Sequence, residues 1–104
     1  MLGRVWPLNM FTKSSTGSEW VAASPEARSG YVAKACRDCS SVGIGDSFPA
    51  LVVEGMDAFF AIPSLRRHLI SFAFGQIHTA QTLLGDYHPL VDSFRIGEQE
   101  AGRL

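Results

Sequence analysis

The chain has 104 residues and nearly balanced charge, with 9 lysine and arginine residues against 10 aspartate and glutamate residues. A single domain is expected at this length, and the 46% of apolar residues is enough to fill one compact core. The charge balance argues against nucleic-acid binding, which needs a basic patch or stripe. Two cysteines are too few for a disulfide-rich scaffold.

Residues 1–18 are expected to form an N-terminal arm and a polar loop. Pro7 disfavours both a helix and a central strand, so the arm is expected to be extended. Residues 12–18, TKSSTGS, have the composition of a loop. The start, MLGRVWPLNMF, lacks the apolar run of a signal peptide, which predicts a cytoplasmic protein. A periplasmic location is expected instead if the sequence is that of a processed or truncated product.

The first helices are predicted between the polar loop and the middle of the chain. Glu19–Ala23 is expected to form one helical turn. Ser24-Pro25-Glu26 then has the features of a helix start: a capping side chain, a proline at the first helical position and an acid in the first turn. This helix is predicted to run from about Pro25 to Arg37. The segment Asp38–Phe48, rich in glycine and serine, is expected to be a loop.

Residues 50–84 hold most of the large apolar side chains, so they are predicted to form the core as two consecutive helices. The first is expected from about Pro49 to Ala61, because its apolar residues recur at the spacing of one helical face. Pro63 then interrupts the helical pattern. The second helix is expected from about Ser64, a candidate N-cap, to Leu84.

The second core helix is predicted to bury a broad apolar arc. This arc comprises Leu65, Leu69, Phe72, Ala73, Ile77, Ala80, Leu83 and Leu84. Arg67 and His78 fall on the opposite, polar side. Ile70 and Phe74 extend the apolar arc toward solvent, which predicts either contact with a third helix or an exposed contact surface.

A short final helix is expected to begin near Pro89 and to end by Gly97, so the helical domain spans residues 19–97. Residues 98–104 are expected to be a frayed tail. Strand patterns are weak throughout, and the expected fold is all-α, a compact bundle of about four helices with an extended N-terminal arm. No membrane span is expected, because Arg66-Arg67-His68 interrupts the longest apolar segment.

The order of several residues resembles that of a known group of proteins. These residues are Gly17, Trp20, Tyr31-Val32, Met56-Asp57, Phe59-Phe60 and Pro63. The order is similar to that of small bacterial helical proteins of unknown function, with G-x-x-W, then Y-V, then a D-x-F-Y-like pair and a proline. More remotely, it resembles the small helical immunity proteins that neutralise type VI secretion effectors. The resemblance implies a non-enzymatic helical domain and transfers no catalytic residue.

Cys36 and Cys39 form a C-x-x-C pair near the end of the first long helix. The pair is compatible with a small disulfide, a redox pair, half of a metal site or two ordinary thiols. No second C-x-x-C and no H-x-x-x-H supplies the other ligands of a structural zinc site. A thioredoxin-type site needs a βαβ context, which the sequence does not indicate. No cofactor is therefore expected.

The remaining candidates for chemistry are isolated. His68, His78 and His88 are too widely spaced on the predicted helices to share one metal, so they are expected to be exposed or locally hydrogen-bonded. Glu54 and Asp57 lie three residues apart, but acid–base catalysis would need a pocket that shifts their pKa values. No nucleophile motif accompanies them, and an enzyme is not expected.

The sequence therefore predicts a non-enzymatic protein-interaction module, immunity-like or adaptor-like, that acts by surface complementarity. It is expected to bind a protein partner or to self-associate as a homodimer. The predicted contact residues are Arg66, Arg67, Ile70 and Phe74, with the segment Cys39–Phe48 as a second candidate surface. The alternative is a metal- or redox-linked protein that uses Cys36 and Cys39.

Overall fold

The computed structural model describes residues 11–43 and 48–102. These residues form five α-helices and one short 3-10 helix, η1, and no β-strand. The elements are α1 (Gly17–Ala22), α2 (Pro25–Ser41), α3 (Pro49–Phe60), η1 (Pro63–Arg67), α4 (Ile70–Leu84) and α5 (His88–Ala101). The predicted all-α class is confirmed. The predicted N-terminal arm falls mainly on residues 1–10, outside the described residues.

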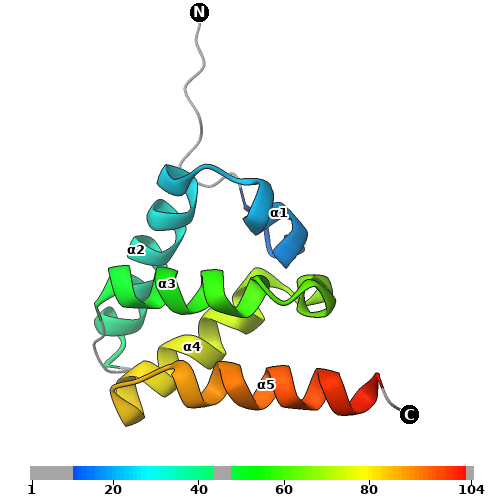
Figure 1. Ribbon diagram of the computed structural model, residues 1–104. Coiled ribbons are helices and arrows are strands. Elements are labelled where there is room, and N and C mark those ends of the chain that lie inside the picture. The colour runs from blue at the N-terminus through cyan, green and yellow to red at the C-terminus, as the bar shows by residue number, and fades with distance from the viewer. Residues whose placement is uncertain (1–10, 44–47, 103–104) are drawn as a thin grey trace, which may run out of the picture.

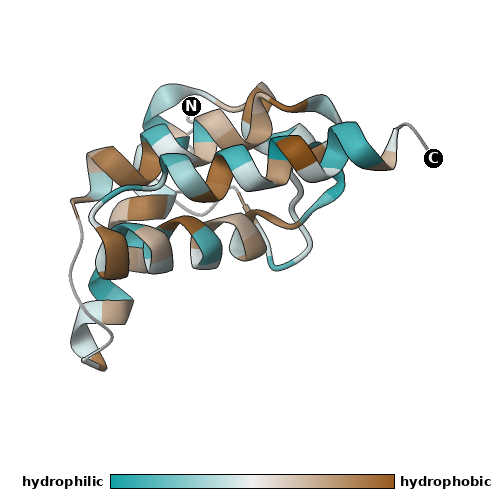
Figure 2. Ribbon diagram, turned by 60° about the horizontal axis from the view of Figure 1, so that its bottom comes forward, coloured by the Kyte–Doolittle hydropathy of each residue, from teal (hydrophilic) through white to brown (hydrophobic). Residues whose placement is uncertain are grey.

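Helix α3 lies at the centre of the fold and contacts every other helix. α3, α4 and α5 follow one another back and forth across the molecule, α2 crosses one end of α3, and α1 lies near the other end (Figure 1). Apolar and polar segments alternate along the helices, as expected of amphipathic helices around one core (Figure 2). None of the described helices is both long enough and apolar enough to span a membrane.

Helix α2 begins where the sequence predicts and ends later. The Ser24 hydroxyl accepts a hydrogen bond from the backbone N–H of Ala27, and Pro25 occupies the first helical position. The helix continues to Ser41, beyond the predicted end at Arg37, so the predicted loop 38–48 starts too early. The reason is that no glycine or proline lies between Arg37 and Gly43, whose φ of 76° is left-handed.

Helix α3 matches its prediction closely, with bounds of Pro49 and Phe60. Val52, Met56, Phe59 and Phe60 are all fully buried, as their spacing predicts. Gly55, on the same helix, lets Ile77 of α4 and Tyr87 pack directly against the α3 backbone.

The prediction of one helix from Ser64 to Leu84 is wrong. Its first part is the 3-10 helix η1, His68 and Leu69 are extended, and α4 begins only at Ile70. The extended residues pair with the segment before α1: the Gly17 N–H donates to the His68 carbonyl at 3.0 Å, and the Ile70 N–H donates to the Ser15 carbonyl at 2.9 Å. Hydrogen bonds between segments distant in the sequence have replaced those of a continuous helix.

The C-terminal helix α5 is longer than predicted. It begins at His88 and ends at Ala101, so residues 98–101 are helical and not part of a frayed tail. Glutamate, glutamine and alanine favour helices, and the lone Gly97 is not enough to end one. Glu98 also lies 3.7 Å from the guanidinium of Arg67, which links α5 to η1.

A buried tryptophan joins three helices near the centre of the fold. Trp20 is fully buried, and its Nε1–H donates a 2.7 Å hydrogen bond to Oδ1 of Asp57 on α3. Arg28 of α2 lies 3.2 Å from the same oxygen. The single carboxylate therefore satisfies the indole N–H, which would otherwise be buried without a partner, and pairs with a cation from α2.

Alanine substitutions at two glycines are expected to have opposite effects. A Cβ at Gly17 would overlap the ring of Phe60 and come within 2.9 Å of the Arg66 Cα, whereas a Cβ at Gly30 would meet nothing within 4 Å. Gly17→Ala should lower the free energy of unfolding by about 1–3 kcal/mol. Gly30→Ala should raise it by about 0.5–1 kcal/mol, since alanine favours a helix interior. Urea unfolding measures both, and equal effects would contradict the close packing at Gly17.

Removing the Asp57 carboxylate is expected to destabilise the fold. Asp57→Ala leaves the buried Trp20 indole without its acceptor, so the free energy of unfolding should fall by about 1–3 kcal/mol. Asp92→Ala is the matched control, because within residues 11–43 and 48–102 Asp92 pairs only with Arg95, one turn away on the exposed side of α5. That change should cost no more than about 0.5 kcal/mol. Similar losses in the two variants would argue against the role of Asp57.

Candidate functional site

The structure separates the four residues predicted as a contact surface. Ile70 is 1% exposed and Phe74 is 9% exposed, so the expectation that they face solvent is wrong. The ring of Phe74 packs edge-on against Tyr31 of α2, with 6.3 Å between ring centroids. Of the two outcomes predicted for this apolar extension, contact with a third helix is the one that the structure shows.

The two predicted cationic contact residues have different environments. Arg66 is half-buried, and its Nε–H donates a 2.7 Å hydrogen bond to the Phe60 carbonyl, which ties η1 to the end of α3. The Arg67 side chain is 64% exposed, and its Nη1 donates to the Ser64 carbonyl. Arg67 is therefore exposed but already pairs with Glu98 of α5, whereas Arg66 is held against the end of α3.

Cys36 and Cys39 both lie within α2, so Cys36 is helical as predicted and Cys39 is not in a loop, contrary to its prediction. Cys36 is buried, Cys39 is half-buried, and no disulfide joins them. Across residues 11–43 and 48–102, no three histidine, cysteine, aspartate or glutamate side chains come together in a way that could hold a metal ion. The geometry of the described residues therefore gives the metal and disulfide alternatives no support. The second candidate surface, Cys39–Phe48, includes residues 44–47, which lie outside the described part.

The three histidines lie in separate environments. His68 stacks on Phe72, and His88 lies 2.6 Å from Asp86. Hydrogen bonds from the backbone and side chain of His88 lower the pKa of Asp86. His78 differs from its prediction: it is buried rather than on the polar side of α4, and it stacks on Phe74. Its Nε2 has no hydrogen-bond partner in the described part of the chain.

Glu54 and Asp57 hold helices together instead of forming an acid–base pair in a pocket. Glu54 accepts a 2.6 Å hydrogen bond from the hydroxyl of Tyr87, just as Asp57 accepts one from Trp20. Burial, and then the hydrogen bond to Glu54, raises the pKa of Tyr87 to about 12. Each carboxylate is therefore engaged with a side chain from a neighbouring segment.

The sequence prediction missed the apolar surface that the fold does expose. Leu69, Phe72, Leu83 and Leu84, all assigned to the buried arc, are 41%, 38%, 75% and 66% exposed. Phe72 and Leu83 lie on one side of α4 together with Gly75, Gln76 and Thr79, and Leu69 precedes them in the extended segment. We call these six residues the α4 outer face. The Phe72 ring also packs against Phe59 of α3 and Phe94 of α5. The later start of α4 and its packing against α3 bury Ile70, Phe74 and Ile77 and turn this other side outward.

The α4 outer face is uncharged as well as partly apolar. Helix α4, ISFAFGQIHTAQTLL, contains no aspartate, glutamate, lysine or arginine. Surface helices of soluble proteins ordinarily carry charged residues on the side away from the core. The exposed side of α5 follows that rule, with Asp92 and Arg95, whereas the exposed side of α4 does not.

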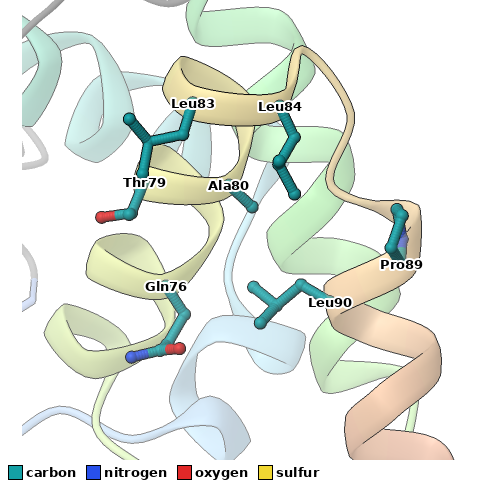
Figure 3. Close-up of a pocket in the computed structure, with 7 residues that line it drawn as sticks. All are labelled: Gln76, Thr79, Ala80, Leu83, Leu84, Pro89 and Leu90. Carbon is teal, nitrogen blue, oxygen red and sulfur yellow. The ribbon is translucent and has the colours of Figure 1, made fainter.

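A groove of about 420 Å³ borders this face, between the C-terminal half of α4 and the start of α5. Its lining residues are Gln76, Thr79, Ala80, Leu83, Leu84, Pro89 and Leu90. Leu84 and Leu90 point into the space between the two helices (Figure 3). None of the seven side chains is an acid, a base or a thiol, so the groove suits an apolar side chain better than a reaction.

Comparisons with protein-family models, with curated proteins and with solved structures find no match to this chain. The resemblance to small bacterial helical proteins and to immunity proteins therefore stays a prediction. The geometry of the α4 outer face and its groove is the basis for a functional proposal.

The hydroxyl of Tyr87 is expected to titrate far above its ordinary pKa of 10.0. The chain has two tyrosines, so Tyr31→Phe leaves Tyr87 as the one phenol, and its absorbance titration should have a midpoint of about 12. Because the folded pKa is raised, the stabilisation is complete below the unfolded pKa and is lost as pH rises toward 12.

The matched variant for this titration is Glu54→Gln in the Tyr31→Phe protein. It removes the carboxylate next to the phenol but not the burial, which is the larger cause of the raised pKa. The midpoint should fall and remain above 10.0. An ordinary midpoint while circular dichroism still shows a folded helical protein would contradict the buried Tyr87–Glu54 contact.

Proposed function

We propose that the protein is a small, non-enzymatic interaction module that binds a protein through the α4 outer face and the adjoining groove. The observation that carries this proposal is an exposed helix side that presents leucine and phenylalanine and has no charge. Interface centres are depleted of charged residues and enriched in aromatic ones. Exposed apolar patches on small soluble domains commonly mark binding sites for proteins.

The side chains around the groove support binding rather than catalysis. The groove contains no titratable group, and the carboxylates that the sequence offered for acid–base chemistry are engaged with Tyr87, Trp20 and Arg28. The resemblance to immunity proteins implies a non-enzymatic helical domain, which agrees with action by surface complementarity. The contact residues in this proposal are those of the α4 outer face with Arg67 at its edge; Ile70 and Phe74 support the face from the core.

A photo-crosslinking amino acid placed on the α4 outer face tests this function. With p-benzoylphenylalanine at Thr79, we expect ultraviolet irradiation of the native cells to produce a covalent protein adduct. The same amino acid at Ser29, an exposed position on α2, is the matched control and should give little or none. Leu83→Glu, combined with the probe at Thr79, should reduce the yield, because it places a charge at the centre of the apolar contact.

The outcomes of this experiment separate clearly. An adduct at Thr79 that Leu83→Glu suppresses supports the proposal, and mass spectrometry then identifies the bound protein. Absence of an adduct at Thr79, or equal yields at Thr79 and Ser29, contradicts it.

A further inference from the structure

Residues of the α4 outer face repeat with a spacing that suits helix pairing. Within α4, Phe72, half-buried Gln76, Thr79 and Leu83 follow one another at separations of four, three and four residues, and Leu69 lies three residues before Phe72 in the extended segment. This is the spacing of the contact positions in a pair of packed helices. Leu69 and Leu83 are 41% and 75% exposed, and Phe72 is 38% exposed while its ring also contacts Phe59 and Phe94.

The two ends of the seam are equivalent, whereas Phe72 and Thr79 lie at different separations from Gln76. Leu69 and Leu83 lie at equal separations from Gln76 along the sequence, so an apolar residue stands near each end and polar Gln76 and Thr79 stand in the middle. Gly75 lies at the same central level, where an added Cβ would meet nothing within 4 Å. A two-fold interface needs a patch that is complementary to itself, and the leucines at the two ends meet that requirement when two copies of α4 run antiparallel.

Charged residues just beyond the two ends of α4 favour an antiparallel pairing of two α4 helices. Arg67, which is 64% exposed and lies 3.7 Å from Glu98, precedes the N-terminal end. Asp86, which is 51% exposed and lies 2.6 Å from His88, follows the C-terminal end. In an antiparallel pair, Arg67 of each copy comes close to Asp86 of the other. The oppositely charged ends of the two helix dipoles also become neighbours. A parallel pair would instead place Arg67 against Arg67 and Asp86 against Asp86.

We propose that the occupant of the α4 outer face is a second copy of this chain, joined through antiparallel α4 helices about a two-fold axis near Gly75 and Gln76. Leu83 of each copy then packs near Leu69 and Phe72 of the other. The groove between α4 and α5 borders this seam along Gln76, Thr79 and Leu83, and it receives apolar side chains of the second copy (Figure 3). This inference rests on the proposed function and names the partner.

The first test is the mass of the purified full-length protein by sedimentation equilibrium. The wild type should be a dimer, and Leu83→Glu should weaken dimerisation by at least about tenfold, because it buries a charge in an apolar seam. Val21→Glu, at an exposed apolar position of α1, is the matched control and should leave the dimer unchanged. Thr79→Glu provides a second disruption of the seam if Leu83→Glu alters the circular dichroism spectrum.

The second test determines the orientation of the two copies. In a Cys36→Ala, Cys39→Ser background that remains dimeric, the Leu69→Cys and Leu83→Cys proteins are mixed and oxidised. An antiparallel pair should give a disulfide mainly between the two different variants, and little when either variant is oxidised alone.

Each contrary outcome has a distinct meaning. A wild type that is monomeric at millimolar concentration, or a dimer insensitive to both Leu83→Glu and Thr79→Glu, overturns the second copy as the occupant. Disulfides formed mainly between identical variants overturn the antiparallel arrangement. A Thr79 adduct with a different protein would leave the proposed function standing while this inference fails, whereas no adduct at all would contradict both.

Discussion

Two backbone hydrogen bonds between segments far apart in the sequence set the start of α4. The Gly17 N–H donates to the His68 carbonyl, and the Ile70 N–H donates to the Ser15 carbonyl. The pairing holds His68 and Leu69 extended, so α4 cannot begin before Ile70. Its start and its packing determine which side chains of α4 meet α3 and which meet solvent. The exposed surface of the protein thus depends on this short contact.

The contact requires a residue without a side chain at Gly17. The Phe60 ring and the backbone of Arg66 occupy the space where a Cβ would lie, so α1 can approach η1 only with glycine there. One turn later, Trp20 enters the core and donates to Asp57, which also pairs with Arg28. The Gly17–Trp20 spacing therefore combines a close backbone approach with a buried aromatic anchor, and this gives the G-x-x-W pattern a physical role.

The burial of Ile70 and Phe74 and the exposure of Leu83 have one common cause. A helix of this composition has apolar residues on nearly all sides, so several orientations would bury a comparable apolar area. Contacts with α2, α3 and α5 select one orientation and leave Leu69, Phe72 and Leu83 outside. In water, an exposed face of this kind gains free energy when another apolar surface covers it. The lack of charge along α4 removes the desolvation cost that would oppose such a contact.

The sequence by itself determined the class of the fold and most helix starts. Pro25 and Pro49 at first helical positions, the Ser24 cap and the apolar spacing of Val52, Met56 and Phe59 act locally, so they can be recognised without a structure. The spacing of the large apolar residues in 50–84 likewise located the core. Local preferences of this kind depend only on neighbours in the chain.

Only the tertiary structure decided which side of α4 is outside. The break at His68 and Leu69 comes from hydrogen bonds to residues 15–17, and no pattern within 64–84 indicates it. The same is true of Asp57 and Glu54, whose partners lie on other helices. The 3–4 spacing of apolar residues up to Leu83 was present in the sequence. Periodicity alone, however, cannot distinguish a face that packs on the core from one that is exposed at the surface.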